Sequence, residues 1–156
     1  MSNIAPSIVS MRDALITQIQ TSLQASADLD VKSFGYAVDK YPGDPKSYRT
    51  TNPVGAILVF YRGSKRGDSM ASAPRVSQLR QADFDITVLS TDLLSQDTAT
   101  KVIDAIDLAV TGYLPSWLDK PMWISKDGFV GVKGGLWQYG ILAHAKFLAL
   151  QQGNLT

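Results

Sequence analysis

The chain has 156 residues, of which 45% are hydrophobic and 19% charged, and this composition is typical of a globular domain with a sizeable core. The formal charge is only +1 and cysteine is absent, so disulfides, thiolate catalysis and cysteine-ligated metals are excluded, and the overall charge does not favour a nucleic-acid or membrane-surface binder. We expect one domain over residues 1–156.

The N-terminal part predicts one helix and two strands. Apolar residues recur at three- and four-residue intervals over about 6–24, which predicts an amphipathic helix. This opening lacks the pattern of a cleaved signal, and no stretch reaches the roughly 20 apolar residues of a membrane span. Residues 31–38 can form a strand, and the proline-rich stretch 41–53 predicts a loop. Residues 55–61 are apolar on both alternating faces, which indicates a central strand covered on each side.

A basic segment follows this strand. Residues 62–80 contain five basic residues and one acidic residue, Asp68, so this segment has a local charge of +4. The basic residues are Arg62, Lys65, Arg66, Arg75 and Arg80. Glycines punctuate the segment, so we expect a long hairpin loop over about 62–75. Loops of this length are usually functional or disordered, because ordering them costs backbone entropy.

The C-terminal part predicts three strands and a helix. Phe84, Ile86 and Val88 alternate with polar residues, as in a strand with one dry face that begins as early as Val76. A second amphipathic helix is predicted over about 97–111, with Gly112 as its C′ residue. Two further strands, 122–132 and 136–150, flank a glycine turn, and one face of the last strand carries Trp137, Tyr139, Ile141, Ala143, Ala145 and Phe147. The order predicts an α+β fold, a mainly antiparallel sheet of about five strands with two helices packed on one side.

Known nucleotide-binding motifs are absent, but two carboxylates share a strand face. Asp83 and Asp85 lie two residues apart, where paired carboxylates can bind Mg²⁺ or divide acid and base roles. The alternative, which we favour, is the solvated face of an amphipathic strand or a partner for basic residues of a neighbouring subunit.

His144 is the only histidine and lies on the opposite face of its strand from Trp137 and Tyr139. A structural or interface role is the more common one for such a residue. A Ser-His-Asp arrangement stays open, because its members meet only in space, although no G-x-S-x-G motif supports one.

The second half of the chain resembles a known family. The stretches that carry the likeness are ADFDITVLSTDL, ATKVIDAIDLAVTGYLPSW and GLWQYGILAHAKF, between about Gln81 and Leu150. They contain a strand F-x-I-x-V, a helix that ends near G-Y-x-P and a closing strand with W-x-Y. Their order and spacing are similar to those of the tail-terminator family of Mu-like contractile-tailed bacteriophages.

The resemblance implies a structural protein without catalytic residues or cofactors. Six copies would form a ring on the last ring of the tail tube, end its polymerisation and join the tail to the head-side connector. Its partners would be itself, the tube protein and further sheath and connector proteins, with DNA only passing through the lumen. Assembly would take place in the host cytoplasm, before the protein is part of the virion.

Heterologous ring contacts need unlike patches on one subunit. The +4 segment and the −3 charge of the chain from Gln81 onward can supply them. We therefore expect the basic segment, mobile in the isolated subunit, to order against the tube, a neighbour or the lumen. The residues expected to bind partners are Arg62, Lys65, Arg66, Arg75, Arg80, Asp83 and Asp85.

Two alternatives remain at this stage. One is another head-tail joining or tail-completion protein. The other is a small hydrolase or metal enzyme that uses Asp83, Asp85 or His144.

Overall fold

The computed structural model describes residues 7–26, 36–41, 55–67, 70–72, 75–91, 96–118, 120–133 and 135–152. In this part of the chain two helices and six strands form an α+β arrangement, as the sequence predicts. Their order is α1 (Ile8–Gln24), β1 (Ala37–Lys40), β2 (Gly55–Arg66), β3 (Met70–Ser72), β4 (Arg75–Thr91), α4 (Gln96–Val110), β5 (Trp123–Lys133) and β6 (Leu136–Gln152).

The strands form one mixed sheet in the order β1-β2-β4-β6-β5, and the short β3 also pairs with β4. The β1–β2 pair is parallel, whereas the other pairs are antiparallel, so the predicted mainly antiparallel sheet is confirmed. The predicted strand at 31–38 shares Ala37 and Val38 with β1, which continues to Lys40, and residues 31–35 lie outside the described residues.

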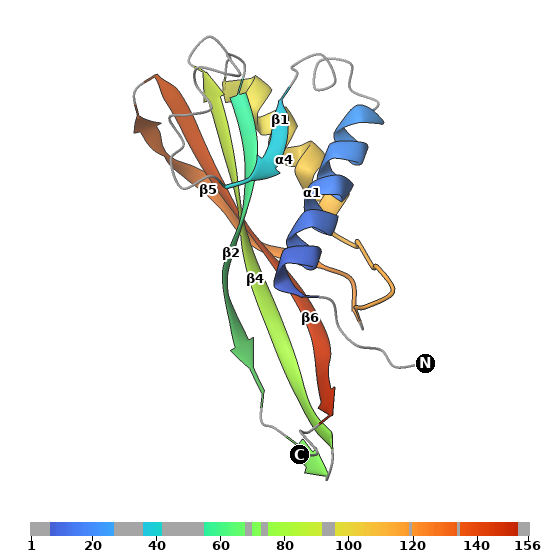
Figure 1. Cartoon of the computed structure of the whole chain (residues 1–156). Coiled ribbons are helices and arrows are strands. Elements are labelled where there is room, and N and C mark those ends of the chain that lie inside the picture. Colours follow the sequence, from blue (N-terminus) through green and yellow to red (C-terminus); the bar gives the residue numbers. More distant parts are fainter. Residues whose placement is uncertain are drawn as a thin grey trace.

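The two longest strands, β4 and β6, determine the shape of the molecule. Each has 17 residues, and they pair continuously from Arg75 opposite Gln152 to Thr91 opposite Leu136. At a rise of about 3.3 Å per residue, each strand is about 55 Å long. Figure 1 shows that they continue past the helices toward the bottom of the view, together with the end of β2. We call residues 60–66, 75–83 and 144–152, which form this part and the adjoining end of the core, the ribbon.

The prediction of a loop over 62–75 is wrong for most of that segment. β2 continues through Arg66, which lies opposite Arg80 of β4, and β3 and Arg75 also belong to paired strands. Long-range pairing with β4 satisfies the backbone groups of this segment and overrides the local turn signal of its glycines. A long basic hairpin loop is therefore not confirmed; residues 68, 69, 73 and 74 lie outside the described residues.

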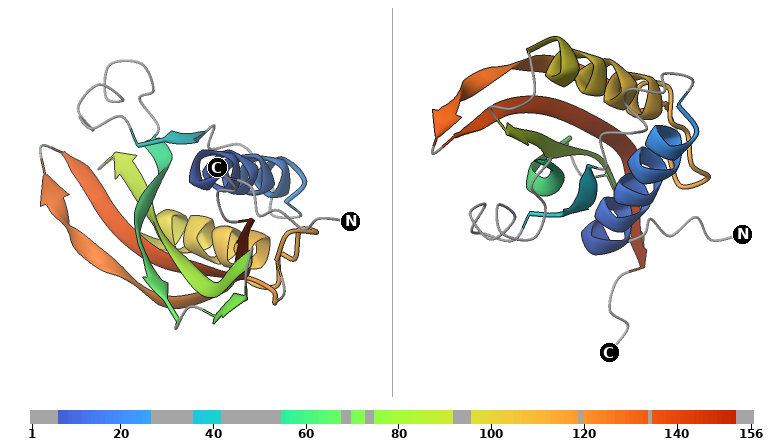
Figure 2. Two further views of the ribbon diagram at one scale, coloured as in Figure 1. Left: turned by 60° about the horizontal axis from the view of Figure 1, so that its bottom comes forward. Right: turned by 90° about the horizontal axis from the view of Figure 1, so that it is seen from above.

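The core lies between the helices and one face of the sheet, which we call the helix face. α1 buries Met11, Leu15, Ile19 and Leu23 against it, and α4 buries Ala99, Val102 and Ile106. The sheet contributes alternate residues of β2, β4 and β6, and on β6 they are the predicted apolar set from Tyr139 to Phe147. The two views of Figure 2 show α1 and α4 side by side, and Gln18 of α1 donates to the carbonyl of Ala109 of α4 at 3.1 Å.

The opposite face of the sheet, the far face, has a smaller apolar cluster and more polar residues. Ala56, Leu58 and Leu89 are buried there, with Tyr41 packed against them. Toward the ribbon, the same face carries Asp83, Asp85 and His144, which alternate with the core residues of their strands.

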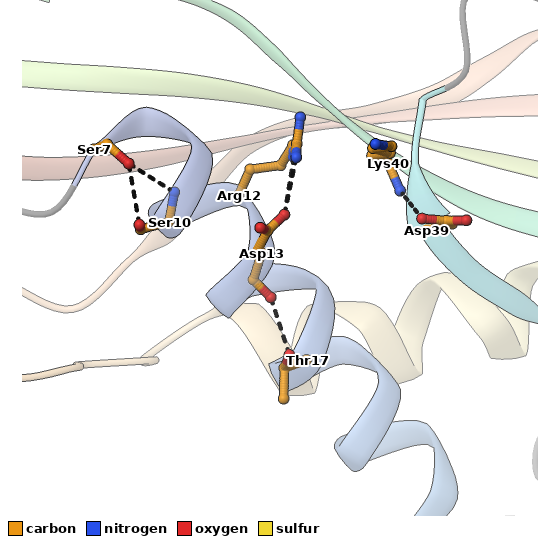
Figure 3. A network of polar contacts seen from close by, with 7 residues as sticks. All are labelled: Ser7, Ser10, Arg12, Asp13, Thr17, Asp39 and Lys40. Carbon is orange, nitrogen blue, oxygen red and sulfur yellow. Dashed lines mark hydrogen bonds and ion pairs between the residues drawn. The ribbon is translucent and has the colours of Figure 1, made fainter.

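The helix boundaries follow capping chemistry. Figure 3 shows the start of α1, where the Ser7 side chain accepts from the Ser10 backbone N–H at 3.1 Å and satisfies a donor that the first turn leaves unpaired. The predicted start at Pro6 lies outside the described residues. α4 ends before Gly112, whose φ of 87° is the left-handed conformation of a C′ glycine, as predicted.

Candidate functional site

Strand register brings together three side chains that are far apart in the sequence. Asp83 of β4 lies opposite His144 of β6, and His144 lies opposite Trp123 of β5. A bulge between Ile124 and Lys126 leaves Ser125 as an extra residue of β5. Bulges re-aim side chains, and here the Ser125 hydroxyl reaches His144.

The histidine uses both ring nitrogens. His144 Nδ1 lies 2.5 Å from Asp83 Oδ1, and His144 Nε2 lies 2.5 Å from Ser125 Oγ. The Trp123 ring stacks on the imidazole with 5.2 Å between the ring centroids. The amide of Gln81 donates to Asp83 Oδ1 at 3.1 Å. We call these five residues the His144 network.

The protonation states follow from these contacts. Burial raises the pKa of Asp83, but hydrogen bonds from His144 and Gln81, together with the charges of His144 and Lys65, outweigh it and lower that pKa below its ordinary value. The ionised carboxylate only accepts, so Nδ1 must carry its proton toward Asp83. When the ring carries only this proton, Nε2 has a free lone pair to which the Ser125 hydroxyl can donate.

Burial divides the network into a shielded part and an accessible part. His144 is only 6% exposed and the Asp83 side chain 15% exposed, whereas Ser125 is exposed. A hydroxyl, an imidazole and a carboxylate in this order are the groups of serine acyl transfer. The sequence left such an arrangement open but did not identify Ser125, since no motif surrounds it and a bulge has no simple sequence signal.

The other predicted carboxylate has a different partner. Asp85 lies on the same far face as Asp83, and its Oδ1 is 3.6 Å from Arg62 of β2. Lys65, also on β2, lies opposite Gln81 and acts electrostatically on Asp83. The two aspartates therefore face basic groups of the same chain, and among the described residues no group of three or more His, Cys, Asp or Glu is placed to hold a metal ion.

Two of the remaining basic residues, Arg66 and Arg80, lie on the helix face of the ribbon. Arg80 donates to Ser64 Oγ at 2.9 Å and to the Tyr61 hydroxyl at 3.1 Å, and its guanidinium lies over the Phe147 ring. Arg66 is exposed and reaches Gln78 at 3.3 Å. Arg75 is paired in β4 opposite Gln152, and its side chain lies outside the described part. The basic segment is thus split between both faces of the sheet.

None of the helices in the described ranges is long and apolar enough to cross a membrane.

The comparisons with known proteins give a family and a fold. A family model described as Gp37 protein matches residues 27–156. No curated protein matches the chain. Among solved structures, the fold is similar to that of a chain in the virion of a native gene transfer agent (GTA) particle, at 18% sequence identity and a TM-score of 0.51. The match covers 92% of this chain and 99% of that chain.

The lowered pKa of Asp83 predicts acid sensitivity. Because this pKa is lower in the folded than in the unfolded chain, ionised Asp83 stabilises the fold above the unfolded value of about 3.9, and the contribution is lost as the pH falls through the folded pKa. In urea unfolding between pH 7 and pH 2, Asp83→Asn should lose less free energy of unfolding on acidification than the wild type.

Gln81→Leu is the graded control for this measurement. It removes one of the hydrogen bonds to Asp83 and leaves the His144 contact, so its acid sensitivity should fall between those of the wild type and Asp83→Asn. Equal acid sensitivity in all three proteins would contradict the lowered pKa of Asp83 in the folded chain.

Proposed function

The chain belongs to the Gp37 family, and from this premise we propose that it is a structural protein of a phage-like virion. The observation that carries the proposal is the similarity in fold to a chain of a GTA virion, which extends over 92% of this chain and 99% of that one. Because the match covers nearly the whole of both chains, the similarity is one of the entire fold and not of a single shared motif.

Within the virion, we propose that the protein is a tail terminator. Copies of it form a ring, a hexamer in the family that the sequence resembles, which caps the tail tube, ends polymerisation and joins the tail to the head-side connector. The partners are other copies, the tube protein, sheath and connector proteins, and DNA only as it passes through the lumen. The protein acts by presenting surfaces, without catalytic turnover, first in the host cytoplasm and then in the neck of the virion.

The edge strand β5 supports self-association. Within the described sheet, β5 pairs with β6 on one side and ends the strand order. Its exposed apolar side chains are Phe129, Val130 and Val132, at 54%, 63% and 57% exposure. Open edges and grouped apolar side chains both favour association with another chain. A heterologous contact between this edge and a different surface of the next subunit gives a ring when the rotation between neighbouring subunits closes.

The ribbon supports a second contact, with the tube or connector. It continues beyond the helices (Figure 1) and carries basic residues on both faces. Lys65 and Arg66 are exposed, so we propose that these two residues contact the tube or connector directly. Four other predicted residues already have partners within the chain, namely Arg62, Arg80, Asp83 and Asp85. We propose that they and Arg75 lie at the periphery of this contact.

A head-tail joining or tail-completion protein of another kind is the alternative. It would use the same surfaces on a different partner. Electron microscopy of the isolated oligomer mixed with tail tubes distinguishes the two, because a terminator binds the tube end and a connector component does not.

Reversing the exposed ribbon charges should prevent capping. Lys65→Glu with Arg66→Glu changes the charge by the same amount as the control pair Lys40→Glu with Lys120→Glu, which lies outside the ribbon. Since charges at the rim of an interface steer association and are screened by salt, the ribbon variant should give tails of uncontrolled length in electron micrographs while the control gives normal ones. Normal tail length with the folded ribbon variant would contradict the assignment.

Charges on the edge strand should prevent ring formation. Val130→Asp with Val132→Asp would bury unpaired carboxylates in the subunit contact, and each such burial costs more than about 1.4 kcal/mol, or a factor of about ten. Light scattering should therefore show a shift from oligomer to monomer. Val9→Asp with Leu108→Asp, at exposed apolar positions of the helices, is the matched control and should keep the oligomer. An edge variant that keeps the wild-type oligomer would exclude β5 from the contact.

A further inference from the structure

We propose that Ser125 is an activated serine that accepts an acyl group from an activated ester, with His144 as the general base and Asp83 as the residue that positions it. This inference goes beyond the structural role proposed above, and its test does not depend on assembly.

The geometry satisfies the requirements of an activated nucleophile. The hydroxyl must lie within hydrogen-bond reach of a base, and a third group must orient that base. Ser125 Oγ lies 2.5 Å from His144 Nε2, and Asp83 Oδ1 lies 2.5 Å from the other ring nitrogen. Each group contacts the atom that its role requires.

The imidazole is held in one orientation from three sides. Asp83 binds it from β4, Trp123 of β5 stacks on its face, and its own strand β6 is paired on both sides at this position. Gln81 donates to the same carboxylate oxygen that His144 contacts, which holds Asp83 in place. A base whose rotamers are restricted in this way loses little entropy when it takes the proton.

The exposure of the three groups suits attack on an external substrate. His144 is 6% exposed, so its contact with Asp83 is largely shielded from water. Ser125 is exposed because it is the extra residue of a bulge in the edge strand, and a small ester can approach its oxygen. A hydroxyl that only satisfied a buried histidine would not need this position.

The step balances without a cofactor. Ser125 Oγ attacks the ester carbonyl carbon, and the hydroxyl proton moves to His144 Nε2. The tetrahedral intermediate expels the aryloxide, which takes the proton from His144 and leaves as the phenol. The products are an O-acyl serine and a phenol, so the transfer is stoichiometric.

The test uses p-nitrophenyl acetate and the full-length protein. The acetylated residue is located by peptide mass spectrometry, and the rate is followed by release of p-nitrophenolate. A positioned general base contributes about 10²–10⁴-fold to such a step. We expect Ser125 to be acetylated at least about 10²-fold faster than Ser116, an exposed serine outside the network.

Variants separate activation from a structural role. Ser125→Ala should remove the fast release of p-nitrophenolate, and Ser116→Ala should leave it unchanged. His144→Gln should slow acetylation of Ser125 by at least about 10²-fold, and Asp83→Asn should slow it and change its pH profile. If His144→Gln does not fold, the comparison of Ser125 with Ser116 in the wild type and the Asp83→Asn profile still decide. Acetylation of Ser125 no faster than Ser116, or unaffected by Asp83→Asn, would overturn the proposal.

Discussion

The continuous pairing of β4 with β6 is the constraint on which the rest of the structure depends. Because the register runs unbroken over both strands, each position of one strand fixes the position that it meets on the other. Residues that alternate along both strands are thereby sorted onto the helix face or the far face, and a slip of one residue would exchange the two sets. The same register places Asp83 opposite His144 and extends the sheet beyond the helices as the ribbon.

The two faces of the sheet have different tasks. The helix face carries the core that α1 and α4 cover, and burial of this core is the main stabilising contribution. The far face holds the His144 network and the Arg62–Asp85 pair, so opposite charges are matched inside one subunit. The exposed charges on the ribbon, Lys65 and Arg66, and the apolar edge of β5 are the surfaces that we propose to contact partners.

The spacing of apolar residues was sufficient to predict those helices and strands that have one clearly apolar and one clearly polar face. Both helices and the buried face of β6 follow from apolar spacing, and the Gly112 cap follows from a glycine placed just after the last apolar residue of α4. The loop prediction over 62–75 was wrong for most of that segment, because glycines and charges signal a turn locally, whereas β4 supplies hydrogen-bond partners that only the tertiary fold reveals. Asp83 and His144 were identified as residues of interest, but their contact joins strands distant in sequence, and Ser125 depends on a bulge. Partner binding by the ribbon residues stays a prediction.

Amide hydrogen exchange of the isolated protein tests most directly whether the ribbon is formed before any partner binds. If β2 is paired with β4 through Arg66, the hydrogen-bonded amides between residues 62 and 66 exchange much more slowly than unstructured peptides, and those of the facing stretch 80–83 are protected with them. Exchange of residues 62–66 at the rate of an unfolded chain, while residues 84–88 stay protected, would show that the end of β2 is not paired in the isolated subunit and would contradict this register.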